Sequence, residues 1–469
     1  MAKVGILTFS DGRRYAHQPQ VEENQRFEAR LRAALSEAGF EVATGEIVWS
    51  NALARSEAEK VSRAGADCTI FNYAVWAFPQ FTVLASRFAP APFLLFGQVN
   101  PAKPGMVAVL AAAGALDQIG LPYVRVFGEI EDPAVLRRVS AFIRAASAAR
   151  ALRGETYGLF GGRSIGINTA VSNTDQWAAQ FGVDVEHIDQ WEIVRRSEAV
   201  PAARRRAGRE WLERSAAKVH YDGRQLTPEK LELQIASYHA VREIIAERGL
   251  DFLGIKAQPE LTEHFATMDI TEAFLNDPYD WEGSHAPIVC ATEADMDAAL
   301  TMEIFKHLSG TPVLFADVRH YFADLDLFDL VNSGQHATYF AGKSFDPEVN
   351  LPKVELHPEG FYFPAGGASV FHIAHPGEVT LARLSREDGA YRMHIVRGEF
   401  VRLGPDQERE RVAAVQPNWP HAFTRLACPA PVFLQSFPTN HIHGVYGDYV
   451  PELLQVCQIL GVRPVLLEG

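Results

Sequence analysis

The 469-residue sequence is poor in cysteine and has no long hydrophobic run. Its cysteines stand far apart, a spacing that fits neither a disulfide framework nor a paired-cysteine metal site, so we expect a reducing, cytoplasmic setting. The amino-terminal residues lack the apolar core of a signal peptide. The longest apolar stretch starts at Val107, is interrupted by Asp117, and is shorter than the ~20 residues of a membrane span. It predicts a buried helix. The four cysteines are Cys68, Cys290, Cys428 and Cys457.

Positive charge is also scarce. The 44 Lys and Arg residues against 58 Asp and Glu residues give a net charge of −14. A negative surface repels phosphate groups, so nucleic acid and anionic membranes are not expected as partners. Hydrophobic residues make up 47% of the chain, which is typical of a globular protein. The length suffices for roughly three domains.

Strand and helix patterns alternate in the first 150 residues. Such alternation is typical of a parallel sheet covered by helices, and it predicts a first α/β domain at residues 1–150. The expected strands are Val4–Thr8, Glu41–Ile47, Cys68–Tyr73, Pro92–Phe96 and Tyr123–Phe127.

A second alternating region predicts an α/β domain at residues 151–310. Beyond it, short strands and frequent Gly and Pro turns indicate a β-rich domain at residues 311–469. The predicted fold class is therefore α/β, with two open Rossmann-like domains followed by a β-rich C-terminal domain. The expected strands of the second domain are Thr156–Phe160, Val183–His187, Phe252–Ile255 and Pro287–Ala291.

Two carboxylates directly follow apolar strands. Glu293 comes after the segment PIVC, and Asp317 comes after PVLF. Open α/β sheets place their ligands at the carboxyl ends of strands, and paired carboxylates are suited to a divalent metal ion. The alternative for both residues is helix N-capping or an ion pair with Arg319.

Histidines are frequent in the last third of the chain. In the segment NHIHG (440–444), His441 and His443 stand two residues apart, so on an extended strand they point to the same face and could meet one ion. Imidazole ligands beside carboxylates favour Mn²⁺, Co²⁺ or Zn²⁺ over Mg²⁺. A single histidine is more often structural than a ligand.

The segment CATEADMDAALTMEIFKHLSGTPVLFADVRHY (290–321) resembles the active-site stretch of L-fucose isomerases. In that family an ATEN-type motif and an FADVR motif supply a metal-binding Glu and Asp with the same separation of 24 residues. On these motifs the chain is identified as a member of the L-fucose isomerase and L-arabinose isomerase family, with a shortened C-terminal domain. Further similar segments are DGRR (11–14), the region of Trp76, IKAQPELTEHFATMDITEAFLN (255–276), NWP (418–420) and NHIHGVYGD (440–448).

The resemblance implies metal ligands, substrate contacts and an acid/base pair. Glu293, Asp317 and His441 would bind the metal, and the two carboxylates would also act as general acid and base. For Arg13 and Arg14 the alternative is a solvated surface pair. For Trp76 and Trp419 the alternative is an ordinary position in the core or at an interface. The residues implied near the sugar are Gln258, Trp76, Trp419, Asn440, Arg13 and Arg14.

Two further histidines have no settled role. His443 stands where the family motif has no histidine. His336 stands at a distance after the second carboxylate at which L-arabinose isomerases have a ligand histidine, and the alternative is a structural role.

The resemblance implies a metal-dependent aldose–ketose isomerase. Its substrate would be a free pentose, hexose or 6-deoxyhexose, and the reaction would pass through a cis-enediol that a divalent ion stabilises. We expect Mn²⁺, with Mg²⁺ or Co²⁺ as alternatives. The family assembles as hexamers with residues from neighbouring subunits in each active site, so we expect a homo-oligomer. A sugar-binding protein without turnover and a related sugar epimerase are the alternative functions.

Overall fold

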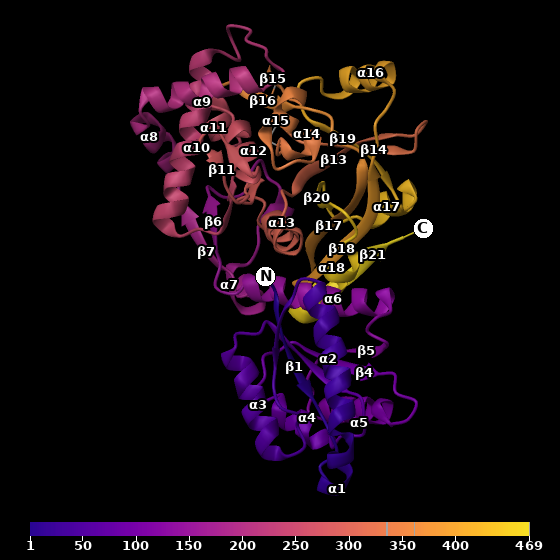
Figure 1. Cartoon of the computed structure of the whole chain (residues 1–469). Coiled ribbons are helices and arrows are strands. Elements are labelled where there is room, and N and C mark those ends of the chain that lie inside the picture. Colours follow the sequence, from indigo (N-terminus) through magenta and orange to yellow (C-terminus); the bar gives the residue numbers. More distant parts are fainter. Residues whose placement is uncertain (334–335, 361, 469) are drawn as a thin grey trace. The chain divides into compact units, whose positions relative to one another are not determined.

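The computed structural model describes residues 1–333, 336–360 and 362–468. They form two compact units, which Figure 1 colours along the sequence. The first unit comprises Met1–Arg150 and Pro451–Ile459, and the second comprises Ala151–Val450 and Leu460–Gly469. Among the described residues, no helix is both long enough and apolar enough to cross a bilayer.

The first unit is a five-stranded parallel sheet with helices on both faces. Its strand order is β2-β1-β3-β4-β5, so the chain starts inside the sheet and extends it to either side. Alternate residues of the strands enter two separate apolar cores, one on each face. The strands are β1 (Lys3–Thr8), β2 (Glu41–Thr44), β3 (Cys68–Tyr73), β4 (Phe93–Gln98) and β5 (Tyr123–Gly128). The helices are α2 (Val21–Glu37), α3 (Asn51–Arg63), α4 (Pro79–Ala85), α5 (Gly105–Gln118), α6 (Pro133–Ala151) and, from the C-terminal part, most of α18 (Val450–Leu460).

Helix α5 corrects one expectation. The apolar stretch from Val107 does form a helix, but only one of its faces is buried. Ala108, Ala112 and Leu116 pack against the sheet, whereas Val107 and Leu110 are more than half exposed. The prediction of a buried helix was wrong for this outer face, because composition alone does not tell which side of an apolar helix is covered.

The second unit begins with a four-stranded parallel sheet in the order β12-β9-β6-β7. Strand β12 begins at Cys290 rather than at the predicted Pro287, and Ile288 instead donates its N–H to the carbonyl of Leu275. The strands are β6 (Thr156–Phe160), β7 (Asp184–Ile188), β9 (Phe252–Ile255) and β12 (Cys290–Thr292). The helices are α7 (Thr174–Gln180), α8 (Trp191–Ala199), α9 (Ala202–Ser215), α10 (Pro228–Arg248), α11 (Glu260–His264), α12 (Asp269–Asn276) and α13 (Met296–Ser309).

The C-terminal part of the second unit is a mixed sheet in the order β17-β20-β13-β14-β19-β18-β21. Strand β17 also pairs with β18, so six of the strands close into a barrel and β21 extends from β18 in parallel. Apolar residues such as Leu314, Leu381 and Ile442 form its core. The strands are β13 (Leu314–Phe322), β14 (Leu327–Val331), β17 (Gly377–Glu387), β18 (Ala390–Phe400), β19 (His421–Leu426), β20 (His441–Tyr446) and β21 (Arg463–Leu467). Two parallel sheets followed by this β-rich part confirm the predicted fold class.

Helix α13 connects the four-stranded sheet to the barrel. It packs against β9 and β12 on one side and against β17 and β20 on the other. Its residues from Met296 to Phe305 are all buried, as expected of a helix covered on every side. The chain therefore brings the end of β12 and the start of α13 next to the barrel strands.

Candidate active site

Glu293 lies in a turn with unusual backbone geometry. It follows β12 with a φ of +58°, and Ala294 follows with +50°. At the end of the adjacent strand β9, Ala257 has a φ of +52°. Left-handed conformations are rare for residues other than glycine, and they concentrate at functional sites. These two turns bring Gln258 and Glu293 together, so that Gln258 Nε2 donates to Glu293 Oε1 at 3.3 Å.

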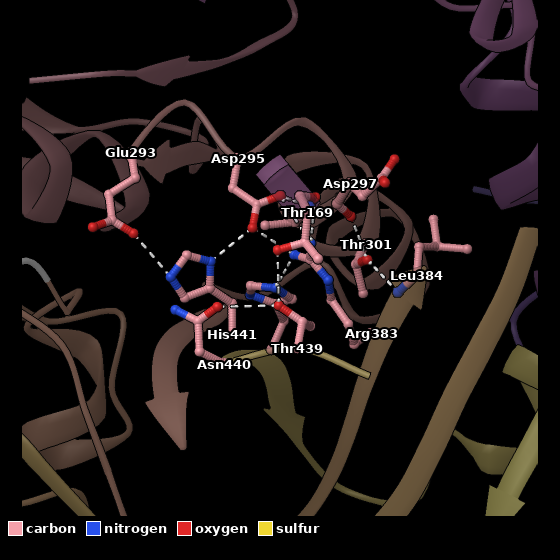
Figure 2. Close-up of polar contacts among 12 residues, drawn as sticks. Thr169, Glu293, Asp295, Asp297, Thr301, Arg383, Leu384, Thr439, Asn440 and His441 are labelled. Carbon is pink, nitrogen blue, oxygen red and sulfur yellow. Dashed lines mark hydrogen bonds and ion pairs between the residues drawn. The ribbon is translucent and has the colours of Figure 1, made fainter. Parts of the chain in front are cut away.

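Asp317 and His441 are neighbours on adjacent strands. The antiparallel register of β13 and β20 pairs the two residues directly. His441 Nε2 lies 2.9 Å from Glu293 Oε2 and 3.4 Å from Asp317 Oδ1. Figure 2 shows the imidazole between Glu293 on one side and Asp295 on the other. One buried imidazole thus contacts both predicted carboxylates.

Asp295 and Arg383 hold this imidazole from behind. Asp295 Oδ2 lies 2.7 Å from His441 Nδ1 and 2.9 Å from Arg383 Nη1, and all three side chains are almost fully buried. Asp295 also caps α13 by accepting a hydrogen bond from the Ala298 N–H at 3.0 Å. Because Nδ1 is held in this way, Nε2 points at the carboxylates of Glu293 and Asp317.

The charges of this cluster are strongly coupled. Burial alone would lower the pKa of His441, but its hydrogen bond to Asp295 and the adjacent carboxylates of Glu293 and Asp317 raise it to about 10. Burial raises the pKa of Asp317, and the attraction of His441 opposes that shift. Burial also works against ionised Asp295, yet Arg383 and His441 hold its pKa well below its ordinary value. The raised pKa of His441 therefore favours a protonated imidazole among the carboxylates of Glu293, Asp295 and Asp317 when no metal is bound.

Asp317 is surrounded by side chains that donate to it. Asn440 Nδ2 donates to its Oδ1 at 3.1 Å, and Asn332 Nδ2 donates to its Oδ2 at 3.3 Å. Arg319 Nη1 lies 3.4 Å from the same Oδ2. The ion pair with Arg319 that the sequence left as an alternative is thus present, whereas the helix cap belongs to Asp295 instead of Glu293.

A pocket of about 490 Å³ opens beside these residues. Trp419 lines it with Arg319, whose guanidinium lies 4.7 Å from the centre of the tryptophan ring. An aromatic face next to hydrogen-bonding groups suits a small polar ligand with an apolar face, such as a sugar ring. The polar and aromatic lining residues are Gln258, Glu293, Asp317, Arg319, Asn332, Ser333, Tyr362, Phe363, Trp419 and Asn440. Five of the predicted site residues therefore share one pocket with His441 beneath it.

The two additional histidines lie elsewhere. His443 Nε2 is 3.2 Å from Arg383 Nη1, so it borders the arginine instead of the two carboxylates. His336 is buried near His372, with ring centres 6.1 Å apart. Neither histidine contacts Glu293 or Asp317 in the contacts of the described residues.

Three predicted residues belong to the first unit. Arg13 forms a two-pronged ion pair with Asp11, at 2.9 Å from Nε and 2.6 Å from Nη2. Arg14 is exposed at the start of the short helix α1 (Arg14–His17). Trp76 is partly buried against the apolar core that contains α3, α4 and α5. Their roles as sugar contacts stay predictions.

Sequence reasoning missed Asp295 and Arg383. The spacing of Asp295, directly before the helical pattern, is the signal of an N-cap and could have been used. Arg383 stands within the apolar strand segment TLARLS, where a charged residue needs a buried partner, but nothing local identifies that partner as Asp295.

The residues present fit a divalent metal ion in their chemistry. Oxygen from Glu293 and Asp317 and nitrogen from His441 form a mixed donor set. His441 Nε2 is buried and makes no well-aligned hydrogen bond among the described residues. The donor atoms of Glu293, Asp317 and His441 do not, however, all lie within 4.8 Å of one another, as the donor atoms of two other groups of described residues do. A single ion would therefore require a carboxylate to turn toward its partner.

Comparison with known proteins identifies the family. Models of the three domains of L-fucose isomerase match this chain: the first N-terminal domain at residues 1–154, the second N-terminal domain at residues 237–310, and the C-terminal domain at residues 330–467. An L-fucose isomerase of Bacteroides thetaiotaomicron is 24% identical over 548 aligned positions, covering 98% of this chain and 92% of the relative. That of Citrobacter koseri is 26% identical over 416 positions, covering 76% and 70%.

Among solved structures, a periplasmic solute-binding protein of an ABC transporter from Actinobacillus succinogenes with bound D-allose has 12% identity and a TM-score of 0.18. The aligned region covers 56% of this chain and 82% of that protein, and this likeness is too weak to carry an argument.

The fold and the pocket define an α/β protein with a buried carboxylate–imidazole cluster at the edge of a parallel sheet. The chain belongs to the L-fucose isomerase family.

Proposed function

We propose that this protein is a divalent-metal-dependent aldose–ketose isomerase acting on a free pentose, hexose or 6-deoxyhexose. The observation that carries the proposal is the joint approach of Glu293 and Asp317 to His441 beside a pocket of sugar-compatible size. A relative that covers 98% of this chain is an L-fucose isomerase, which supports the same reaction class.

The chain would perform the proton transfers with its carboxylates. Glu293, Asp317 and His441 would hold a divalent ion, which would supply Lewis-acid polarisation of the sugar oxygens. One carboxylate would remove the proton from C2 of the aldose, the proton of the C2 hydroxyl would move to O1, and the proton taken from C2 would return at C1 to give the ketose. Gln258 orients Glu293 through its hydrogen bond, and Asn440 orients Asp317 in the same way.

The metal ion, the location and the assembly that we propose follow from the family. We propose Mn²⁺ as the ion, with Mg²⁺ or Co²⁺ as substitutes, and a cytoplasmic homo-oligomer, a hexamer by resemblance. Arg13, Arg14 and Trp76 would then contact sugar in the site of another subunit. The exposed apolar side chains of α5, Val107 and Leu110 among them, support an additional contact surface on the first unit.

The experiment is Mn²⁺-dependent conversion of a panel of pentoses, hexoses and 6-deoxyhexoses, with and without EDTA, in deuterated solvent. Metal-dependent ketose formation with deuterium entering the carbon skeleton supports the proposal. Tight sugar binding without conversion or exchange would instead show a binding protein, and exchange with configuration change but no ketose would show an epimerase.

Glu293→Gln provides the residue-level test. It should abolish turnover while preserving the fold and sugar binding, because it keeps the side-chain shape and removes the base. Glu260→Gln is the matched control: Glu260 lies near the same sheet edge but pairs with Lys256 and does not line the pocket. Full activity of Glu293→Gln would refute the acid/base assignment.

A further inference from the structure

A second group of metal-binding side chains lies where β8 (Lys218–Val219) runs beside β15 (Glu355–Pro358). His220 follows β8 and donates its backbone N–H to the carbonyl of Leu356 at 2.8 Å. Glu355 and His357 stand two residues apart on β15, so their side chains share one face of the strand. The backbone pairing therefore places His220, Glu355 and His357 side by side. None of the three lines the pocket described above.

The donor atoms of this group converge on one carboxylate oxygen. His220 Nε2 lies 2.5 Å from Glu355 Oε2, and His357 Nε2 lies 3.3 Å from the same oxygen. The two imidazole rings stack with centres 4.1 Å apart, and the three donor atoms all lie within 4.8 Å of one another. Zinc ligand bonds of about 2.1 Å at tetrahedral angles separate neighbouring donors by roughly 3.4 Å. Shifts of about 1 Å would thus accommodate an ion here.

The protonation states also suit a metal ion. Burial and the neighbouring His220 lower the pKa of His357, so its ring is neutral near pH 7 and Nε2 keeps its lone pair. That nitrogen is shielded from solvent and makes no well-aligned hydrogen bond among the described residues. Burial opposes the charge of Glu355, but His220 lowers its pKa below the ordinary value. Two imidazoles and one carboxylate, with partial exposure for a water ligand, form a donor set typical of Zn²⁺.

A second cluster in the same unit shows what distinguishes this group. Glu155, Glu303 and His307 meet the same 4.8 Å spacing. There, however, Lys306 already pairs with Glu303. Burial would lower the pKa of His307, but Glu155 and Glu303 raise it to about 9. The positive charges of Lys306 and His307 therefore already neutralise that cluster. No lysine or arginine pairs with Glu355 in the ion pairs of the described residues.

We propose that His220, Glu355 and His357 bind Zn²⁺ and so fasten β8 to β15 across 135 positions of sequence. The site is separate from the pocket of Glu293 and Asp317 and does not depend on isomerase activity. The ion would replace the direct contact between His220 and Glu355 with three ligand bonds.

The test is a Zn²⁺ titration of the full chain after EDTA treatment and dialysis, read by calorimetry for stoichiometry. Wild type should bind one equivalent more than Glu355→Gln or His357→Ala. His264→Ala, which removes an exposed histidine of the same unit, and His307→Gln, which alters the cation-filled cluster, should keep the wild-type stoichiometry. His441→Ala should retain this equivalent even if the pocket loses its own metal.

Cobalt gives a readout that a purely structural role would not change. Wild type loaded with Co²⁺ should show the strong visible absorption of a tetrahedral ion, and Glu355→Gln, which keeps side-chain size, should lose it. Wild-type Zn²⁺ stoichiometry in both Glu355→Gln and His357→Ala would overturn the proposal. Failure of the sugar conversion assay with these metal results intact would refute only the isomerase function.

Discussion

Replacing Asp295 with Asn tests how the buried cluster is held together. Asn has nearly the same shape and caps helices as well as Asp, so the cap on α13 survives. The change removes the negative charge that contacts both Arg383 and His441. Arg383 is only 1% exposed. Leaving a buried charge without its partner costs 3–5 kcal/mol in general, and Arg383 keeps its hydrogen bond to the Thr169 carbonyl, so we expect about 3 kcal/mol.

The measurement is amide hydrogen exchange of α13 and β20 in the metal-free protein, which reports the stability of this unit by itself. A loss of about 3 kcal/mol predicts exchange roughly 100-fold faster than in wild type. Mn²⁺ affinity should also fall by about 10- to 100-fold, because Asp295 no longer orients His441.

Asp297→Asn is the matched control. Asp297 is also buried near the start of α13, but its partner Arg386 is 23% exposed and it does not touch His441. It should cost less stability and leave Mn²⁺ affinity unchanged. Wild-type exchange and metal affinity in Asp295→Asn would refute the view that this carboxylate holds the imidazole.

Three further outcomes are expected. Trp419→Ala should raise KM for the sugar about 10-fold while Trp419→Phe stays near wild type, because the ring face makes the contact; equal KM values would contradict this. The pKa of His441 rises from about 6.5 in the unfolded chain to about 10 in the fold, so its contribution to the stability of the metal-free protein is complete below pH 6.5, and up to about 5 kcal/mol of it is lost toward pH 10. Denaturation at several pH values checks this. In His441→Gln the loss of stability toward pH 10 should be smaller, and the part that comes from His307, whose pKa is also raised, should remain. His443→Gln should keep the wild-type Mn²⁺ content, since His443 borders Arg383, whereas His441→Gln should lose metal in the same chelation assay.

The sequence was sufficient to predict the two parallel sheets, because the signals of their strands are local. Cys68–Tyr73 and Phe252–Ile255 are continuous apolar runs, and both form buried parallel strands with the predicted bounds. The expected strand Pro287–Ala291 starts later, at Cys290, because the N–H of Ile288 donates to the carbonyl of Leu275, a contact that no local pattern reveals. The exposed face of α5 was not predicted either, because the composition of an apolar helix does not tell which of its faces another element covers.

For the candidate site, the sequence predicted which residues take part but not how they are arranged. The motifs around Glu293, Asp317 and His441 were readable in the sequence because residue type and spacing carry the chemistry. Their common position depends on the register of β13 with β20 and on the left-handed backbone at Glu293. The domain boundaries at 150 and 310 and the roles of the first-unit residues stay predictions.

The sequence by itself determined the composition of the chain, its alternating elements and the resemblance of its motifs. Only the tertiary structure showed that the strand from Gly377 to Glu387 closes the barrel and brings Arg383 to Asp295, 88 positions away. The physical reason is that hydrophobic periodicity records which face of an element is covered but not which element covers it. Partners of buried charges are decided by packing among distant segments, and such packing brings Asp295 and Arg383 to His441.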